Sequence, residues 1–152
     1  MKLENRCVVP ADQATTWELV MDFPRVAPCV PGLTELEADG EDGYKGTLRA
    51  QAGPMRVNLA GTVRVVSSDP QLGEARFLLE AADRRIGGSV KTSMTLHLAP
   101  TDDGQTELTI NTDTAFMGAL GTLGQPIIRR KAAATVEEFA RNLAGLVASQ
   151  GM

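Results

Sequence analysis

The segment FPRVAPCVPGL, at residues 23–33, places Cys29 between two prolines. A cysteine thiol acts as a nucleophile when a nearby base or positive charge favours its thiolate form. The chain has one histidine, His97, and the alternation of residues around it puts its side chain on the outward face of a predicted strand. Since no base is evident, we expect Cys29 to be a small wall residue near the mouth of a binding cavity.

Catalysis by a general acid or base would need ionisable side chains on the inward faces of the strands. Tyr44 and Glu35 are the candidates there, and no second group is evident to pair with either. An enzyme is kept as the alternative to a binding protein. Cys7 and Cys29 are the only cysteines and lie in no CxxC or His–Cys cluster, so we expect neither a disulfide framework nor a bound metal.

Length and composition are those of an ordinary globular protein. The 152 residues are 43% hydrophobic and 22% charged, so we expect one domain that spans residues 1–152. The net charge of −4 argues against a nucleic-acid partner, which would favour a basic surface. No signal peptide and no run of about 18 apolar residues is evident, so we expect a cytoplasmic protein whose contact with a membrane is peripheral.

The pattern of residues predicts a strand, two short helices, six further strands and a long helix. Alternation at residues 2–9 is typical of a half-buried strand, and Asp12 is a suitable N-cap for a helix over 13–21. Residues 33–115 alternate between turn signals, and helical spacing with a glycine-rich, loose start extends over 119–149. The apolar stripe of that helix is Ile128, Ala132, Thr135, Val136, Phe139, Leu143 and Leu146. The prediction is an α+β fold, in which a curved seven-stranded antiparallel sheet wraps around the long C-terminal helix.

The predicted inward faces of the strands combine apolar residues with several small ones. The small residues are Gly46, Ala50, Gly61, Ala75 and Ala81. Small residues on a concave sheet under a helix leave room for an apolar ligand. The alternative is that the helix packs closer to the sheet and fills the space. The alternation of residues leaves both interpretations open.

Four stretches carry a family resemblance. They are the tryptophan of TTWELVMDF, CVPGL at 29–33, YKGTLRAQAGPMRVNLAGTVRV at 44–65, and GALGTLGQPIIRRKA at 118–132. In their order and spacing, the chain resembles the carbon monoxide dehydrogenase G-subunit family of the START-like (SRPBCC) helix-grip superfamily, which includes lipid carriers and polyketide cyclases. The resemblance covers nearly the whole chain and implies a helix-grip fold with two short helices after the first strand.

The resemblance also implies a non-catalytic accessory protein of a molybdenum hydroxylase, with no covalently bound cofactor. Members of the family are associated with attaching such a dehydrogenase to the inner face of the cytoplasmic membrane, or with its assembly. Longer members carry a C-terminal tail, whereas this chain ends at Met152 after the predicted helix, so we expect no anchoring through a tail. Since the same superfamily contains enzymes, the resemblance also implies an alternative, an enzyme of the cyclase or dehydratase type that would use Tyr44 or Glu35. A pure scaffold with a filled cavity and an exposed apolar interface is a further alternative.

The apolar inward faces and the link to a redox enzyme favour a lipophilic ligand, either a lipid or, more specifically, a respiratory quinone. The hydroxyl of Thr92 or Thr112 would hydrogen-bond to its head group. Large apolar residues alternate with glycines from Met117 onward and form either a flexible gate or an ordinary helix start. The expected ligand-binding residues are Cys29, Leu48, Val57, Leu59, Gly61, Phe77, Leu79, Thr92, Met94, Leu96, Ile110, Thr112, Met117, Leu120, Leu123, Gly124 and Ile127.

A short basic run, Arg129, Arg130 and Lys131, falls near the start of the predicted long helix. Such a run is usually a solvated helix face. It is also suited to contact with anionic lipid head groups or with an acidic partner, and we expect it to be the membrane or partner contact.

Overall fold

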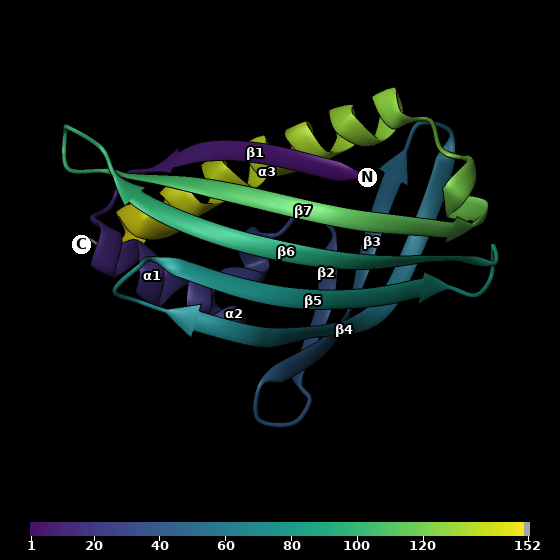
Figure 1. Ribbon diagram of the computed structural model, residues 1–152, viewed down its shortest axis with the longest axis horizontal. Coiled ribbons are helices and arrows are strands. Elements are labelled where there is room, and N and C mark those ends of the chain that lie inside the picture. Colours follow the sequence, from purple (N-terminus) through teal and green to yellow (C-terminus); the bar gives the residue numbers. More distant parts are fainter. Residues whose placement is uncertain (151–152) are drawn as a thin grey trace.

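The computed structural model describes residues 1–150 as one antiparallel sheet with a long helix packed on its concave side (Figure 1). The seven strands lie in the order β1-β7-β6-β5-β4-β3-β2. The elements are β1 (Lys2–Val9), α1 (Gln13–Met21), α2 (Phe23–Val26), η1 (Ala27–Cys29), β2 (Leu33–Ala38), β3 (Gly43–Ala52), β4 (Met55–Asp69), β5 (Glu74–Asp83), β6 (Gly88–Pro100), β7 (Thr106–Gly118), η2 (Ala119–Thr122) and α3 (Gln125–Gln150). This is the helix-grip arrangement that the sequence predicts.

The curvature of the sheet depends on a row of small residues across its middle strands. Gly46 on β3 pairs with Gly61 on β4, and Gly61 pairs in turn with Ala81 on β5. A Cβ atom on Gly61 would lie 1.9 Å from the carbonyl oxygen of Glu80, and one on Gly46 would lie 2.3 Å from that of Glu35. Both distances are far below van der Waals contact, so the backbones approach this closely only because these residues are glycine. Figure 1 shows β3 and the adjoining part of β4 turned steeply away from the direction of β5, β6 and β7.

The long helix α3 packs toward one edge of the sheet. Its contacts are most extensive with β1, followed by η1. Leu143, which is fully buried, joins Val9, Leu108 and Cys29 in the main core cluster. Burying a leucine in this way stabilises the fold by about 2–3 kcal/mol. The predicted apolar stripe of the helix is confirmed, since all its members from Ile128 to Leu146 are buried or half-buried.

Two boundaries differ from the prediction. The helix α3 begins at Gln125 rather than near residue 119, and a separate 3-10 turn, η2, precedes it. The break follows Gly118, whose φ of 63° and ψ of −136° suit glycine alone. Strand β7 also continues through Met117 instead of ending near residue 115.

The predicted N-cap of helix α1 is confirmed, because the carboxylate of Asp12 accepts a 2.7 Å hydrogen bond from the amide of Thr15.

Replacing Gly61 by alanine should destabilise the fold, because the new Cβ would overlap the carbonyl of Glu80 and push β4 away from β5. We expect urea-induced unfolding to show a loss of about 2–3 kcal/mol or more. Gly145→Ala in α3 is the matched control, since nothing lies within 4 Å of its added Cβ. This control should stabilise the protein by about 0.5–1 kcal/mol. Equal unfolding midpoints for Gly61→Ala and the native chain would contradict the role given to this glycine.

Candidate functional site: an apolar cavity

An apolar cavity of about 420 Å³ lies against the concave face of β3, β4, β5 and β6. Inward side chains of these strands form one wall, among them Leu48, Leu59, Leu79 and Met94. The remaining wall residues are Phe23, Val26, Ala27 and Val30, from α2, η1 and the residue after η1, and Leu33 and Leu36, from the edge strand β2. A concave, mostly apolar site of this size is typical of small-molecule binding.

Three of the six aromatic side chains of the protein gather at this cavity. The ring centroid of Phe23 lies 5.0 Å from that of Tyr44 and 5.6 Å from that of Phe77, with the ring planes tilted by 44° and 42°. Tilted pairs at these separations are favourable for aromatic rings. Phe23 and Tyr44 line the cavity, whereas Phe77 is buried against Phe23. Together they give the cavity a preformed aromatic wall against which a flat ring can pack.

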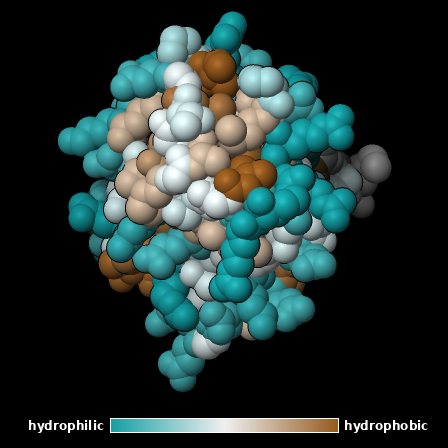
Figure 2. All heavy atoms as spheres, turned by 90° about the vertical axis from the view of Figure 1, so that its right-hand side faces the viewer, coloured by the Kyte–Doolittle hydropathy of each residue, from teal (hydrophilic) through white to brown (hydrophobic). Residues whose placement is uncertain are grey.

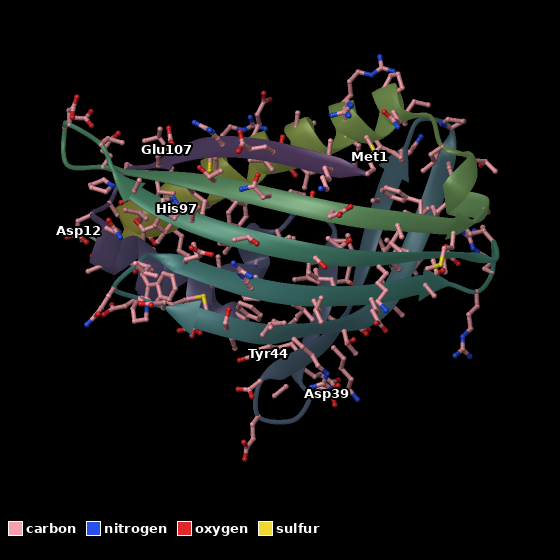
Figure 3. All side chains as sticks on the ribbon, viewed as in Figure 1. Met1, Asp12, Asp39, Tyr44, His97 and Glu107 are labelled. Atoms are coloured by element: carbon pink, nitrogen blue, oxygen red, sulfur yellow. The ribbon has the colours of Figure 1, made fainter. Side chains whose placement is uncertain are left out.

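The polar groups at the cavity are hydroxyls. Thr92, in the cavity wall, shares a 2.9 Å hydrogen bond with the hydroxyl of Thr114 on the neighbouring strand. When the hydroxyl of Thr114 donates this bond, the hydroxyl hydrogen of Thr92 is available to a ligand in the cavity. Tyr44, near the start of β3, adds a phenol (Figure 3). Uncharged hydroxyls in an apolar wall suit a neutral ligand that carries carbonyl or hydroxyl oxygens.

The described residues bring no acid–base pair together at this cavity. Glu35 is exposed on β2, and His97 is exposed on β6 and lies well apart from Tyr44 in Figure 3. Glu80 borders the cavity, but its side chain is exposed, and its carboxylate lies 3.4 Å from the ammonium of Lys91. Tyr44 is thus left without the partner that the cyclase or dehydratase alternative requires.

Cys29 lies in the core beside the cavity and not in its wall, where the sequence analysis placed it. Its side chain is 5% exposed and packs in the cluster that contains Leu143. Burial raises the pKa of the Cys29 thiol, which disfavours the nucleophilic thiolate. Its carbonyl oxygen accepts a 3.0 Å hydrogen bond from the side-chain amide of Asn142 on α3. Cys29 therefore helps to fasten the wall segment to the long helix.

The structure divides the predicted ligand-binding residues among several places. Those in the cavity wall are Leu48, Leu59, Gly61, Leu79, Thr92 and Met94. Phe77 is buried and supports the wall through its contact with Phe23. Leu96 and Ile110 pack against the core cluster, and Thr112 is half-buried opposite Met94.

The expected gate around Met117 is not found at this cavity. Met117 is 46% exposed, because β7 continues through it and the inward position falls on its neighbour Phe116. Leu120 is 3% exposed and packs over Gly88 at the start of β6. The turn η2 is thereby held down on the sheet.

Leu123 and Gly124, in the connection from η2 to α3, and Ile127, in the first turn of α3, also lie outside the cavity wall. Ile127 packs over Gly53 in the β3–β4 turn. The expectation of a cavity between the sheet and the long helix is thus corrected. The helix lies toward β1, and the segment at residues 23–30 borders the cavity instead.

This segment is what the sequence analysis missed. Its apolar residues at positions 23, 26, 27 and 30 follow helical spacing, which was the available signal. Because prolines flank Cys29 in the same stretch, the segment was interpreted as a rigid rim of the cavity and not as one of its walls. The sequence analysis placed Tyr44, Gly46 and Ala81 on inward strand faces but did not assign them to the ligand site. The wall also contains Val63 and Val90.

A second hollow, of about 800 Å³, lies between α3 and the β3–β4 hairpin. Its charged wall residues are Arg49, Arg56, Arg85, Lys131 and Glu138. Val57, another predicted ligand-binding residue, lies in this wall. Leu48 belongs to the walls of both hollows, so the two adjoin. Arg129 and Arg130 are exposed on α3 just before Lys131.

The carboxylate of Asp83 is buried beside this second hollow and fixes the turn between β5 and β6. It accepts hydrogen bonds from the amide of Asn58 at 2.8 Å, from the amide of Arg85 at 3.1 Å and from the guanidinium of Arg85 at 3.4 Å. The Asn58 amide is the main cause that holds the pKa of Asp83 below its ordinary value. Arg85 adds to this effect, and burial opposes it.

The family model for the G subunit of carbon monoxide dehydrogenase (CoxG) matches residues 6–148 of this chain. No curated protein gives a significant match. None of the helices in residues 1–150 combines the length and the apolar composition that a bilayer crossing requires.

Solved structures share the fold at low sequence identity. A conserved protein from Geobacillus kaustophilus has a TM-score of 0.87 and 20% identity, over 98% of this chain and 96% of that one. The Zhui aromatase/cyclase from Streptomyces sp. R1128 has a TM-score of 0.61 and 17% identity, over 99% and 92%. Norcoclaurine synthase from Thalictrum flavum has a TM-score of 0.62 and 15% identity, over 97% and 86%. Likeness at these identities establishes the helix-grip fold.

Cys29 should react slowly with iodoacetamide at neutral pH, because its thiol is buried and its pKa is raised. We expect alkylation of the folded protein, followed by peptide mass spectrometry, to be at least about tenfold slower than in the urea-unfolded chain. The half-buried Cys7 provides an internal comparison. Faster alkylation of Cys29 in the folded than in the unfolded chain would identify an activated thiol and contradict the structural role.

Asp83→Asn should lower stability in a pH-dependent way. Because the pKa of Asp83 is lowered in the folded state, its contribution is fully present above the unfolded value of about 3.9 and is lost as pH falls through the folded value. The gap between the thermal unfolding midpoints of the native and Asp83→Asn chains should therefore be constant above about pH 5 and narrow below about pH 4. A gap that widens on acidification would contradict this assignment.

Proposed function

This chain belongs to the CoxG family, named for the G subunit of carbon monoxide dehydrogenase, and from that premise we propose that it is a non-catalytic accessory protein of a molybdenum hydroxylase. In this role it holds a lipophilic small molecule in the apolar cavity. It recruits the dehydrogenase to the inner face of the cytoplasmic membrane or assists its assembly. The observation that carries the proposal is the preformed 420 Å³ cavity with its apolar and aromatic wall.

The ligand of this proposal is a respiratory quinone. Its flat ring would pack against the Phe23–Tyr44 wall, and its apolar chain would follow the leucines of β3, β4 and β5. The free hydrogen of the Thr92–Thr114 pair, or the phenol of Tyr44, would donate to a quinone carbonyl oxygen. A neutral ring with two carbonyls satisfies such donors without burying a charge. A dehydrogenase that passes electrons to the membrane has a use for a carrier of this kind.

An enzyme of the cyclase type is the second candidate, favoured by the phenol of Tyr44 in the cavity wall and by the shared fold of an aromatase/cyclase. It would use Tyr44 as a proton donor. The described residues place no carboxylate or imidazole beside that phenol, so the carrier function ranks first.

Leu79→Trp should fill the cavity and weaken quinone binding. Leu79 lines the cavity, whereas its neighbour Leu78 faces outward and is 44% exposed, so Leu78→Trp is a matched control. In equilibrium dialysis against decylubiquinone, we expect Leu79→Trp to raise the Kd at least about tenfold, because overpacking of a filled site costs about 1–3 kcal/mol. The Leu78→Trp chain should bind as the native chain does.

Two outcomes would count against this function. If the native chain binds a long-chain fatty acid but no quinone analogue, the quinone assignment fails and the lipid-carrier function remains. If Leu78→Trp weakens binding as much as Leu79→Trp does, the ligand does not occupy this cavity.

A further inference from the structure

Positive charge is concentrated at one end of this acidic protein. Residues 49–58, 83–88 and 117–131 together carry seven of its 15 Lys and Arg residues but one of its 19 Asp and Glu residues. Outside these three segments the chain is strongly acidic. Although the net charge of the whole chain is −4, these three segments together carry a net positive charge. We call the surface formed by these segments the basic end face.

The fold brings the three segments together although they are far apart in the sequence. The amide of Ala119 donates a 3.1 Å hydrogen bond to the carbonyl of Gly87, and this joins η2 to the β5–β6 turn. Ile127 packs over Gly53 in the β3–β4 turn. The guanidinium of Arg85 donates to the carbonyl of Arg56 at 3.1 Å. In Figure 1 all these turns and the start of α3 lie at the right-hand end of the molecule.

The cations of this face are largely free of acidic partners. Arg85 is paired with Asp83 at 3.4 Å. Within residues 1–150 no ion pair involves the other six: Arg49, Arg56, Arg84, Arg129, Arg130 and Lys131. By contrast, cations elsewhere on the sheet, such as Lys45, Arg76 and Lys91, lie within 4 Å of a carboxylate. Free cations grouped on one surface produce a positive local potential.

Apolar side chains interrupt these charges. Met117 is 46% exposed, and Ile86, Leu123 and Ile127 are half-buried. Figure 2 looks at this end of the molecule and shows apolar and weakly polar residues gathered near its middle, with hydrophilic residues around them. An apolar centre within a cationic rim matches an anionic bilayer, whose head groups attract the cations and whose acyl region accepts the apolar side chains.

We propose that the basic end face docks the protein on a bilayer of anionic phospholipid. This inference specifies the surface for the membrane recruitment in the proposed function and rests on that part of it. The second hollow opens within the same surface, since Arg49, Arg56, Arg85 and Lys131 line it, and it adjoins the ligand cavity at Leu48. Docking in this orientation turns the hollow toward the lipid, so that a lipophilic ligand has a short route between bilayer and cavity.

The test is co-sedimentation with vesicles at about 0.1 M salt, where surface charges still act over about 10 Å. The native chain should bind vesicles of equimolar phosphatidylglycerol and phosphatidylcholine and should not bind vesicles of phosphatidylcholine alone. Replacing Arg84, Arg129 and Arg130 by glutamine should weaken binding about 100-fold, at about fivefold for each charge. The matched control replaces Lys45, Arg76 and Lys91 by glutamine. It makes the same change in net charge, removes only exposed ion pairs, and should retain binding within a few-fold.

A second measurement reports the orientation of the docked protein. An environment-sensitive dye on Met117→Cys should shift its emission to shorter wavelength when anionic vesicles are added. The same dye on Asp103→Cys, in the β6–β7 turn at the other end of the molecule in Figure 1, should not shift. The labelled native chain corrects for reaction at Cys7.

The proposal is overturned if the native chain does not bind anionic vesicles, if the control triple variant loses as much binding as the Arg84, Arg129 and Arg130 variant, or if the Asp103→Cys dye shifts instead. Quinone binding in dialysis is measured without vesicles. If the chain binds quinone but does not bind vesicles, the carrier function is retained and the docking face is rejected. If it binds vesicles but not quinone, the docking face is retained and quinone binding is rejected.

Discussion

The close approach of backbone at Gly61 is the constraint on which the rest of this structure depends. With a carbonyl oxygen 1.9 Å from where its Cβ would be, this residue lets β4 and β5 approach more closely than any side chain would permit. Gly46 plays the same part between β3 and β2. The bend turns a sheet into a concave surface, and that concavity leaves a cavity beside the small residues of the same row.

Helix α3 and the segment at residues 23–30 cover different parts of the concave face and have different roles. Helix α3 packs toward β1 and builds the main core with α1 and η1, so the protein gains its stability there. The short segment at residues 23–30 borders the other half of the sheet, where most wall residues are only partly buried and space remains. Cys29 connects the two regions, because its side chain lies in the core and its carbonyl is bonded to Asn142 on α3. A stable core thus supports an open site without filling it.

The fold could be predicted because its signals are local and repeated. Strand alternation, the Asp12 cap and the apolar stripe of α3 each matched the structure. The position of the cavity could not be predicted, because it depends on which half of the sheet α3 covers, and that is decided by tertiary packing around Leu143. Met117 was misplaced for a simpler reason, since the strand runs past it and the period of two places Phe116 inward. Of the basic end face only Arg129, Arg130 and Lys131 could be predicted from the sequence, because its other four cations come from two separate segments that the fold brings beside them.

The central claim is that this protein carries a lipophilic molecule in the cavity beside the Gly61 row. Native mass spectrometry of the protein purified from its own cells, followed by solvent extraction, tests it most directly. The account predicts a mass increase of one bound molecule and an extract that contains a quinone in about equal amount to the protein. A protein of unshifted mass, whose extract contains no isoprenoid or lipid, would contradict it and leave a scaffold without a cargo.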